Sequence, residues 1–150
     1  MPQAILLREH GGPEVLRVED IAVAAPGPGE VRIRQTAVGV NFHDCYVRSG
    51  LYQTLKLPGI PGLEAAGMVI AVGDSVAGFA PGDRVAYFFA AYGSYASERV
   101  IGADRLVKIP NGVNDATAAS LMIKGLTALM LVKHVHALGP DDTILVHAAA

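Results

Sequence analysis

The side chains best suited to chemistry crowd into one short stretch of the chain, residues 41–52. Tyr46 and Tyr52 stand six positions apart in it, and together they could supply flat ring surface and a hydroxyl donor beside a bound ligand. His43 and Cys45 stand two positions apart, so their nitrogen and sulfur atoms could in principle bind a metal ion. The alternatives that need no ligand are packing beneath a loop for the tyrosines, and an incidental pair in an amphipathic turn for His43 and Cys45.

The other metal-binding residue types are too sparse to build a site. Cys45 is the single cysteine in 150 residues, and one thiolate cannot form a four-cysteine zinc site or an internal disulfide. His134 and His136 fall near the end of a predicted helix, where they suit the negative end of the helix dipole. No activating partner for Cys45 is fixed by the sequence, so a packed thiol is expected rather than a nucleophile. One cysteine also fits a reducing, cytosolic setting.

The elements that must position this stretch are mainly strands separated by glycine and proline turns. Apolar residues recur at a period of two, as where Val31 and Ile33 alternate with arginines. The stretch 41–49 breaks this alternation and is predicted as a short helix. The stretch 51–61 contains Pro58 and Pro61 and is predicted as a loop. The predicted strands cover residues 4–8, 15–20, 31–40, 64–72, 84–90, 93–100 and 105–109.

The last third of the chain has a helical character. Asn114 or Asp115 can cap a first helix, and residues 125–137 predict a second one, which ends at a glycine and a proline. The second helix is apolar on most sides, so we expect it to be buried on most sides. The run TILVHAAA at 143–150 is typical of a central parallel strand.

The composition bounds the class of protein. With 51% hydrophobic and 17% charged residues, the chain has enough apolar material for one real core. A formal net charge of −2 shows no basic excess, so no nucleic-acid partner is expected. No continuous apolar run reaches the roughly 18 residues that a membrane span needs, and charges are spread over the N-terminus. Neither a membrane span nor a signal peptide is expected.

Five motifs occur in a fixed order along nearly the whole chain. They are GVNFHDCYVRSGLY at 39–52, GLEAAGMVIAVG at 62–73, PGDRV at 81–85, KGLTA at 124–128 and TILVHAAA at 143–150. Together they resemble the medium-chain dehydrogenase/reductase superfamily. Within it, the first motif and the opening HGGPEVL at 10–16 are most similar to the zinc-free NADPH:quinone oxidoreductases.

The resemblance implies a mainly β fold with a few helices. A GroES-like, partly open β-barrel over residues 1–124 would form the substrate-side domain. The first helix and strand of a Rossmann domain would follow over residues 125–150, truncated before the glycine-rich loop that cradles a dinucleotide pyrophosphate. We therefore expect the chain by itself to bind NADPH no more tightly than weak millimolar affinity.

Two positions that hold zinc ligands in the alcohol dehydrogenases of this superfamily differ here. The resemblance puts Asn41 where those enzymes have a cysteine and Leu63 where they have a histidine. Neither an amide nor an isobutyl group is a credible zinc ligand, and Glu64 cannot hold the ion alone. No zinc is expected, and Glu64 is interpreted as a buried structural acid that bonds the backbone or an arginine.

The resemblance also assigns site residues. The catalytic residues it implies are Asn41, Tyr46 and Tyr52, and the cofactor-binding residues it implies are Asn41, Asp44, Lys124 and Thr127. Asn41 would point at the reaction centre, where its amide could donate to a carbonyl or contact the nicotinamide ribose. The structural alternatives are a turn-forming role for Asn41, a helix cap or salt bridge for Asp44, and a solvated helix start for Lys124.

The implied activity is transfer of electrons or hydride from NADPH to a small-molecule quinone, in the cytoplasm, by a parent protein that forms a homodimer through its nucleotide domain. A quinone ring is already a good electron acceptor, so it can dispense with the Lewis acidity of zinc. A zinc-free enone or enoyl-thioester reductase on the same scaffold is the rival enzyme. A non-catalytic folding module is the rival interpretation of residues 1–150 alone.

Overall fold

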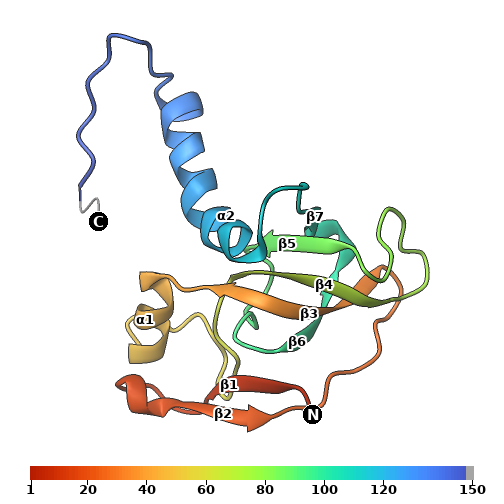
Figure 1. The fold of residues 1–150 in the computed structure, drawn as a ribbon. Coiled ribbons are helices and arrows are strands. Elements are labelled where there is room, and N and C mark those ends of the chain that lie inside the picture. The colour runs from red at the N-terminus through yellow and green to blue at the C-terminus, as the bar shows by residue number, and fades with distance from the viewer. Residues whose placement is uncertain (148–150) are drawn as a thin grey trace.

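Two antiparallel sheets dominate the computed structural model, which describes residues 1–147 (Figure 1). The smaller sheet pairs β1 (Gln3–Leu7) with β2 (Leu16–Asp20), and a 3-10 turn over Pro13–Val15 joins them. The larger sheet has five strands in the order β6-β3-β4-β5-β7. Their bounds are β3 (Glu30–Gly39), β4 (Glu64–Val72), β5 (Arg84–Phe88), β6 (Glu98–Gly102) and β7 (Val107–Lys108), with a 3-10 turn over Ala103–Arg105.

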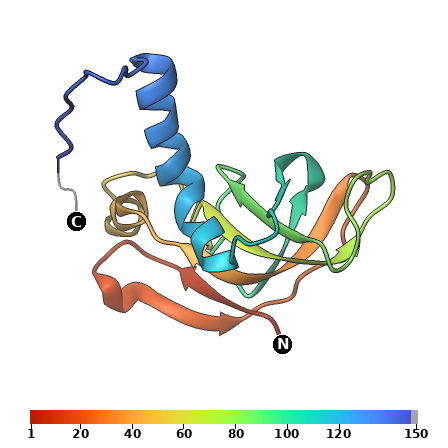
Figure 2. The same cartoon turned by 45° about the horizontal axis from the view of Figure 1, so that its top comes forward.

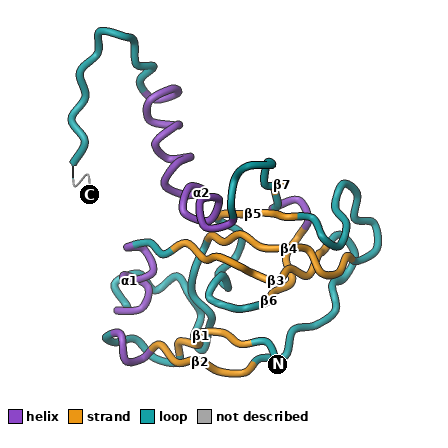
Figure 3. Tube along the Cα trace, viewed as in Figure 1, coloured by secondary structure: helices purple, strands orange, loops and turns teal. Residues whose placement is uncertain are grey.

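The two sheets are joined by isolated bridges and not by a continuous ladder. Ala4 bridges to Ala96, and Leu7 bridges to Gly59. The β1–β2 hairpin therefore lies beneath the larger sheet as a separate layer, with long loops between them (Figures 1 and 3). This arrangement confirms the predicted mainly β fold and the partly open barrel.

The core on one face of the larger sheet follows from the period-two alternation. Val31 and Ile33 are fully buried and meet Val69 of the neighbouring β4. Tyr87 is the largest fully buried side chain, and its hydroxyl donates a 2.9 Å hydrogen bond to Ser94 Oγ. Because an unpaired buried hydroxyl is costly, this bond lets a tyrosine fill the core.

A single helix, α2 (Asp115–Met130), begins on the opposite face of the sheet and rises away from it (Figure 2). Its Ala118 and Ala119 pack against Ala66 and Ala86, small side chains that allow a close approach. At its N-terminus, Asn114 Oδ1 accepts a 2.8 Å hydrogen bond from the amide of Thr117, which confirms the predicted cap.

The first residue of α2 anchors the helix to the sheet. The carboxylate of Asp115 accepts hydrogen bonds from the Thr36 hydroxyl of β3 and from the Arg84 guanidinium of β5. These bonds, with the Thr36 hydroxyl first, hold the pKa of Asp115 below its ordinary value. The start of α2 is therefore fixed by charge as well as by packing.

The prediction of two separate helices in this region is wrong. Residues 115–130 form one continuous helix with Gly125 inside it, because a single glycine weakens a helix interior by only about 1 kcal/mol and does not break it. A π-helical turn over Leu131–Val135 follows. The expected boundary at 124/125 falls inside α2, and the division into two domains stays a prediction.

The expectation that the second half of this helix is buried is also wrong. Leu126, Leu129 and Met130 are each 40–48% exposed, since only the first turns of α2 reach the sheet. By length and composition, the helical stretch Asp115–Val135 is apolar enough to cross a membrane: an 18-residue window in it has a mean hydropathy of 1.4, contrary to the expectation from continuous apolar runs. Mostly buried core helices of soluble proteins can be equally apolar, whereas 11% of this window is buried.

The predicted strand at 143–150 is not formed over its described part. Residues 143–147 make no ladder, and Ile144, Leu145 and Val146 are 53–80% exposed. A strand needs a neighbour for its backbone groups, and no described strand lies beside this segment. Residues 148–150 lie outside the described part of the chain.

The predicted helix at 41–49 is confirmed as α1 (Phe42–Ser49). Asn41 occupies its N-cap in an extended conformation, and Asp44 Oδ2 accepts a 2.9 Å hydrogen bond from the Asn41 backbone amide. Gly50 ends the helix at a φ of 82°, a left-handed conformation that favours glycine. The loop predicted over 51–61 follows.

Candidate active site

A cavity of about 470 Å³ opens where the end of β3, the start of α1 and the middle of α2 meet. Its lining residues are Val40, Asn41, Phe42, Cys45 and Lys124. Asn41 projects here because it caps α1, and Cys45 follows one helical turn later on the same face. An amide, an ammonium group and a thiol thus stand among apolar atoms, a lining suited to a flat and partly polar ring.

Asn41 and Lys124 converge on one buried carboxylate. Asn41 Nδ2 donates to Glu64 Oε1 over 2.8 Å, and Lys124 Nζ donates to the same oxygen over 3.1 Å. The side chain of Glu64 is 0% exposed, whereas that of Lys124 is 52% exposed. The interpretation of Glu64 as a buried acid that bonds the backbone is confirmed, because the Ile123 amide donates to its Oε2 over 2.7 Å. Its charged partner is a lysine and not an arginine.

Asp44 faces the interior instead of the cavity. The residue is 5% exposed, and its Oδ2 accepts from the Asn41 amide and, over 2.9 Å, from the hydroxyl of Tyr95. Its Oδ1 is buried without a hydrogen-bond partner among the described residues. Burial first, and the neighbouring Asp44 second, raise the pKa of Tyr95. The structure thus gives Asp44 a capping role, and contact with a cofactor stays a prediction.

The two predicted tyrosines lie together in an aromatic cluster. The rings of Tyr46 and Tyr52 meet edge to face with centroids 5.2 Å apart, and the His43 ring lies 5.6 Å from that of Tyr52. His43 Nε2 is 2.8 Å from the hydroxyl of Tyr92, which also hydrogen-bonds Thr54 Oγ1 over 2.6 Å. Tyr46 and Tyr52 are 39% and 44% exposed and are not among the residues that line the cavity beside Asn41.

Thr127 occupies α2 three residues after Lys124, so both belong to one face of the helix. Its side chain is exposed and is not among the residues that line the cavity. The structure thus places Asn41 and Lys124 at one site, with Thr127 further along the same helix face.

No group of three or more histidine, cysteine, aspartate or glutamate side chains within the described residues could hold a metal ion. His43 is hydrogen-bonded to Tyr92, while Cys45 lines the cavity. Leu63, at the second expected ligand position, is 7% exposed and contributes to the core. His136 lies 3.9 Å from Asp142 beyond α2.

Sequence reasoning missed two tyrosines that support these residues. Tyr92 and Tyr95 lie in the segment 93–100 or beside it, where a strand was expected, but the strand begins only at Glu98. Gly93, at a φ of 129°, interrupts the extended chain there, and this segment instead forms a loop that reaches α1. Two tyrosines flanking a glycine were the available signal.

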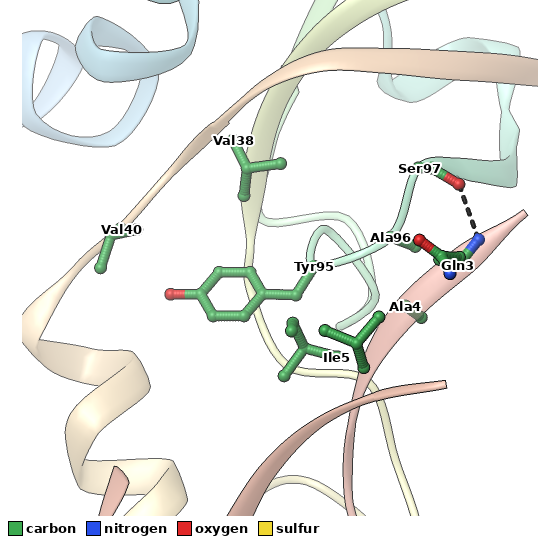
Figure 4. Close-up of a pocket in the computed structure, with 9 residues that line it drawn as sticks. Gln3, Ala4, Ile5, Val38, Val40, Tyr95, Ala96 and Ser97 are labelled. Atoms are coloured by element: carbon green, nitrogen blue, oxygen red, sulfur yellow. Dashed lines mark hydrogen bonds between the residues drawn. The ribbon is translucent and has the colours of Figure 1, made fainter. Parts of the chain in front are cut away.

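A second cavity, of about 390 Å³, lies on the far side of Val40, between the β1–β2 hairpin and the end of β3 (Figure 4). Val40 lines both cavities. The ring of Tyr95 forms one wall beside Val38 and Ile5, and its hydroxyl points away toward α1 (Figure 4). The lining is almost wholly apolar.

Residues 27–111 match the family described as the alcohol dehydrogenase GroES-like domain. The whole chain is 46% identical to a quinone oxidoreductase of Pseudomonas aeruginosa and 41% identical to a 2-haloacrylate reductase of a Burkholderia species. It spans 46% of the length of each of these relatives.

A solved structure of a quinone oxidoreductase is also similar to this chain. A quinone oxidoreductase of Escherichia coli in complex with NADPH is similar to this chain with a TM-score of 0.89 and 39% sequence identity. The similarity covers 93% of this chain and 43% of that one.

Proposed function

This chain belongs to the alcohol dehydrogenase GroES-like domain family, and from that premise we propose that the protein is a zinc-free, NADPH-dependent quinone oxidoreductase of the medium-chain dehydrogenase/reductase superfamily. The observation that carries the proposal is the cavity beside Asn41, where an amide bound to a buried carboxylate stands in place of a zinc ligand. The similarity to quinone oxidoreductases supports the choice of substrate.

The donor set of the cavity fits the nicotinamide end of NADPH, a flat ring that carries an amide. Asn41 and Lys124 would contact that end, and Thr127 would contact the cofactor further along α2. When bound, NADPH supplies the hydride. Phe42, which is 81% exposed, and Cys45 offer the apolar surface that keeps water from one side of such a ring.

The aromatic cluster beside the cavity fits a quinone. Tyr46 and Tyr52 expose ring surface at one edge, and their hydroxyls can donate to the oxygen that gains negative charge during reduction. The His43 ring packs against Tyr52, and the hydroxyl of Tyr92 hydrogen-bonds His43 in turn. No side chain is required as an obligatory acid, because a water molecule or either tyrosine can deliver the proton.

The side chains at the two positions that differ from the zinc ligands of the alcohol dehydrogenases support a reaction without zinc. The Asn41 amide is bonded to Glu64, and Leu63 has no donor atom. Glu64 uses both carboxylate oxygens in hydrogen bonds to the protein. Metal coordination would therefore have to break these bonds.

We also infer a cytoplasmic homodimer, in which α2 is a helix of the globular fold and not a membrane span. The single cysteine supports a reducing compartment. Packing of Ala118 and Ala119 on the sheet, together with the ionic anchor of Asp115, supports a helix that belongs to the globular fold.

Two substitutions in the full-length parent protein, and not in the 150-residue chain alone, test the site. Asn41→Ala should raise KM for NADPH about ten-fold, because one hydrogen bond in a cavity is lost. Tyr52→Phe should lower kcat/KM for a quinone by a similar factor. Asn111→Ala, the same truncation in an exposed turn, serves as the control and should change neither value. Unchanged kinetics in both site variants would refute the assignment of the site.

A second function, reduction of an activated carbon–carbon double bond, is favoured by the 41% identity to a 2-haloacrylate reductase. A zinc-free enone or enoyl-thioester reductase would use the same cavity. Turnover of a 1,4-quinone should exceed that of an α,β-unsaturated ketone at equal NADPH concentration. The reverse order would assign the protein to this second class.

A further inference from the structure

Glu64 is the charged side chain that the fold encloses most completely, and it lies directly behind the cavity. It begins β4, opposite Gly39 of β3, and its side chain is 0% exposed. A Cβ atom on residue 39 would clash with Glu64 Oε1, so glycine at that position leaves the room that the carboxyl group occupies. The carboxyl group thereby reaches past β3 to both helices.

Three donors from two separate elements meet this carboxyl group. Oε1 accepts from Asn41 at the start of α1 and from Lys124 in α2, and Oε2 accepts from the backbone amide of Ile123 over 2.7 Å. A buried charge is tolerated only with such partners, and removing one partner is expensive. Glu64 therefore fixes the two cavity-lining polar groups relative to each other.

The carboxylate also decides which way the Asn41 amide points. An ionised carboxylate only accepts hydrogen bonds, so the Nδ2 end of Asn41 must face Glu64. The carbonyl oxygen Oδ1 is then the end turned away from Glu64. The bond to Glu64 uses one of the two N–H groups of Asn41, so Oδ1 and the second N–H are left for a ligand. Donation from Asn41 to a carbonyl, or its contact with the nicotinamide ribose, stays a prediction.

We propose that Glu64 is a positioning residue that presents the carbonyl oxygen of Asn41 and the ammonium group of Lys124 to the ligand. The cavity then favours a ligand that offers a donor to the Asn41 carbonyl oxygen and an acceptor to the Lys124 ammonium group, as the carboxamide of NADPH does. This inference rests on the proposed function for the identity of the ligand. Glu64 does not touch the ligand itself, because it is enclosed and both its oxygens are occupied.

Glu64→Gln in the native protein tests the orientation. The new amide must present its NH₂ group either to the Ile123 amide or to Asn41 and Lys124, so a donor meets a donor unless Asn41 turns over. Turning Asn41 over points its NH₂ group into the cavity. KM for NADPH should then rise about ten-fold, while kcat changes by less than about three-fold.

A double variant, Glu64→Gln with Asn41→Asp, supplies the rescue. The introduced glutamine can donate to the introduced aspartate and accept from the Ile123 amide. Lys124 can pair with that aspartate, and an acceptor oxygen again faces the cavity. KM should return to within about three-fold of the wild-type value. If Glu64→Gln fails to fold, the double variant must still fold and keep this KM, and failure on either point overturns the proposal.

Asp115→Asn is the matched structural control. It also changes an acid to an amide and loosens the start of α2, but Asp115 does not line the cavity. It should lower Tm without changing KM for NADPH, and a KM rise equal to that of Glu64→Gln would reduce Glu64 to a structural residue.

Absence of quinone reduction in the wild-type protein would refute the proposed function alone. The orientation of the Asn41 amide can then be tested by alkylation of Cys45, from which bound NADPH should protect the thiol. Glu64→Gln should weaken this protection about ten-fold, and the double variant should restore it.

Discussion

Tyr95 and Asp44 share a partly buried hydrogen bond whose energy depends on the proton of the phenol. The hydroxyl donates to Asp44 Oδ2, which also accepts from the N-cap amide of α1. Loss of the phenolic proton would place a second negative charge beside this carboxyl group in a partly enclosed site. Burial and Asp44 raise the pKa of Tyr95 for this reason.

The sign of the resulting pH dependence follows from the raised pKa of Tyr95. The stabilisation is present in full below the ordinary tyrosine pKa of about 10 and is lost as the pH rises above it, since the unfolded chain ionises first. Tyr95→Phe should lower Tm by an amount that is constant up to that pH and shrinks above it. Thermal melts of both proteins across the alkaline range measure this difference, and a constant deficit at all pH values would contradict the argument.

At the scale of elements, the β3–β4 pair supports both the core and the site. Ile33 is fully buried on one face of this pair, while Met68 is 42% exposed on the other. The chain continues from the end of β3 into Asn41, and β4 starts at Glu64. The packing that stabilises the β3–β4 pair therefore also sets the positions of Asn41 and Glu64 beside the cavity.

Ile33→Ala should lower the free energy of unfolding by about 3 kcal/mol, because it removes buried methylene groups and leaves a cavity. Met68→Ala, on the exposed face of the adjacent strand, should change it by less than about 1 kcal/mol. Urea denaturation of the two variants compares them directly. Equal losses would mean that the core does not lie on the face described.

At the scale of the whole molecule, the proposed cofactor contacts cover only a small part of a dinucleotide. The proposed contacts with NADPH are the side chains of Asn41, Lys124 and Thr127, all directed to one end of the cofactor. The sequence contains no glycine-rich loop between a strand and a helix, which is the usual pyrophosphate site. The relatives it matches are about twice as long.

Titration of NADPH into the 150-residue chain should therefore show binding no tighter than the millimolar range. The reason is that a few contacts at the nicotinamide end cannot replace those to the phosphates. Isothermal calorimetry or quenching of tyrosine fluorescence measures the affinity. Saturation at micromolar NADPH would show that the chain holds a complete cofactor site.

The sequence by itself determined most of the strands and α1. Period-two alternation, an N-cap residue and glycine turns act between near neighbours, so they can be recognised without the fold. The same local rules gave errors where distant partners decide: the run at 143–147 has the composition of a strand but no neighbour, and α2 passes through Gly125.

Only the tertiary structure decided which partners the polar side chains beside the cavity bind. Asn41 precedes Glu64 by 23 positions, and Glu64 precedes Lys124 by 60, so no local pattern could pair them. The fold brings them together because Gly39 lets the Glu64 carboxyl group pass beside β3. Hydrogen bonding then fixes the direction of each polar group, because a carboxylate can only accept. The sequence specifies the residue types, whereas tertiary packing decides the direction in which each side chain donates or accepts a hydrogen bond.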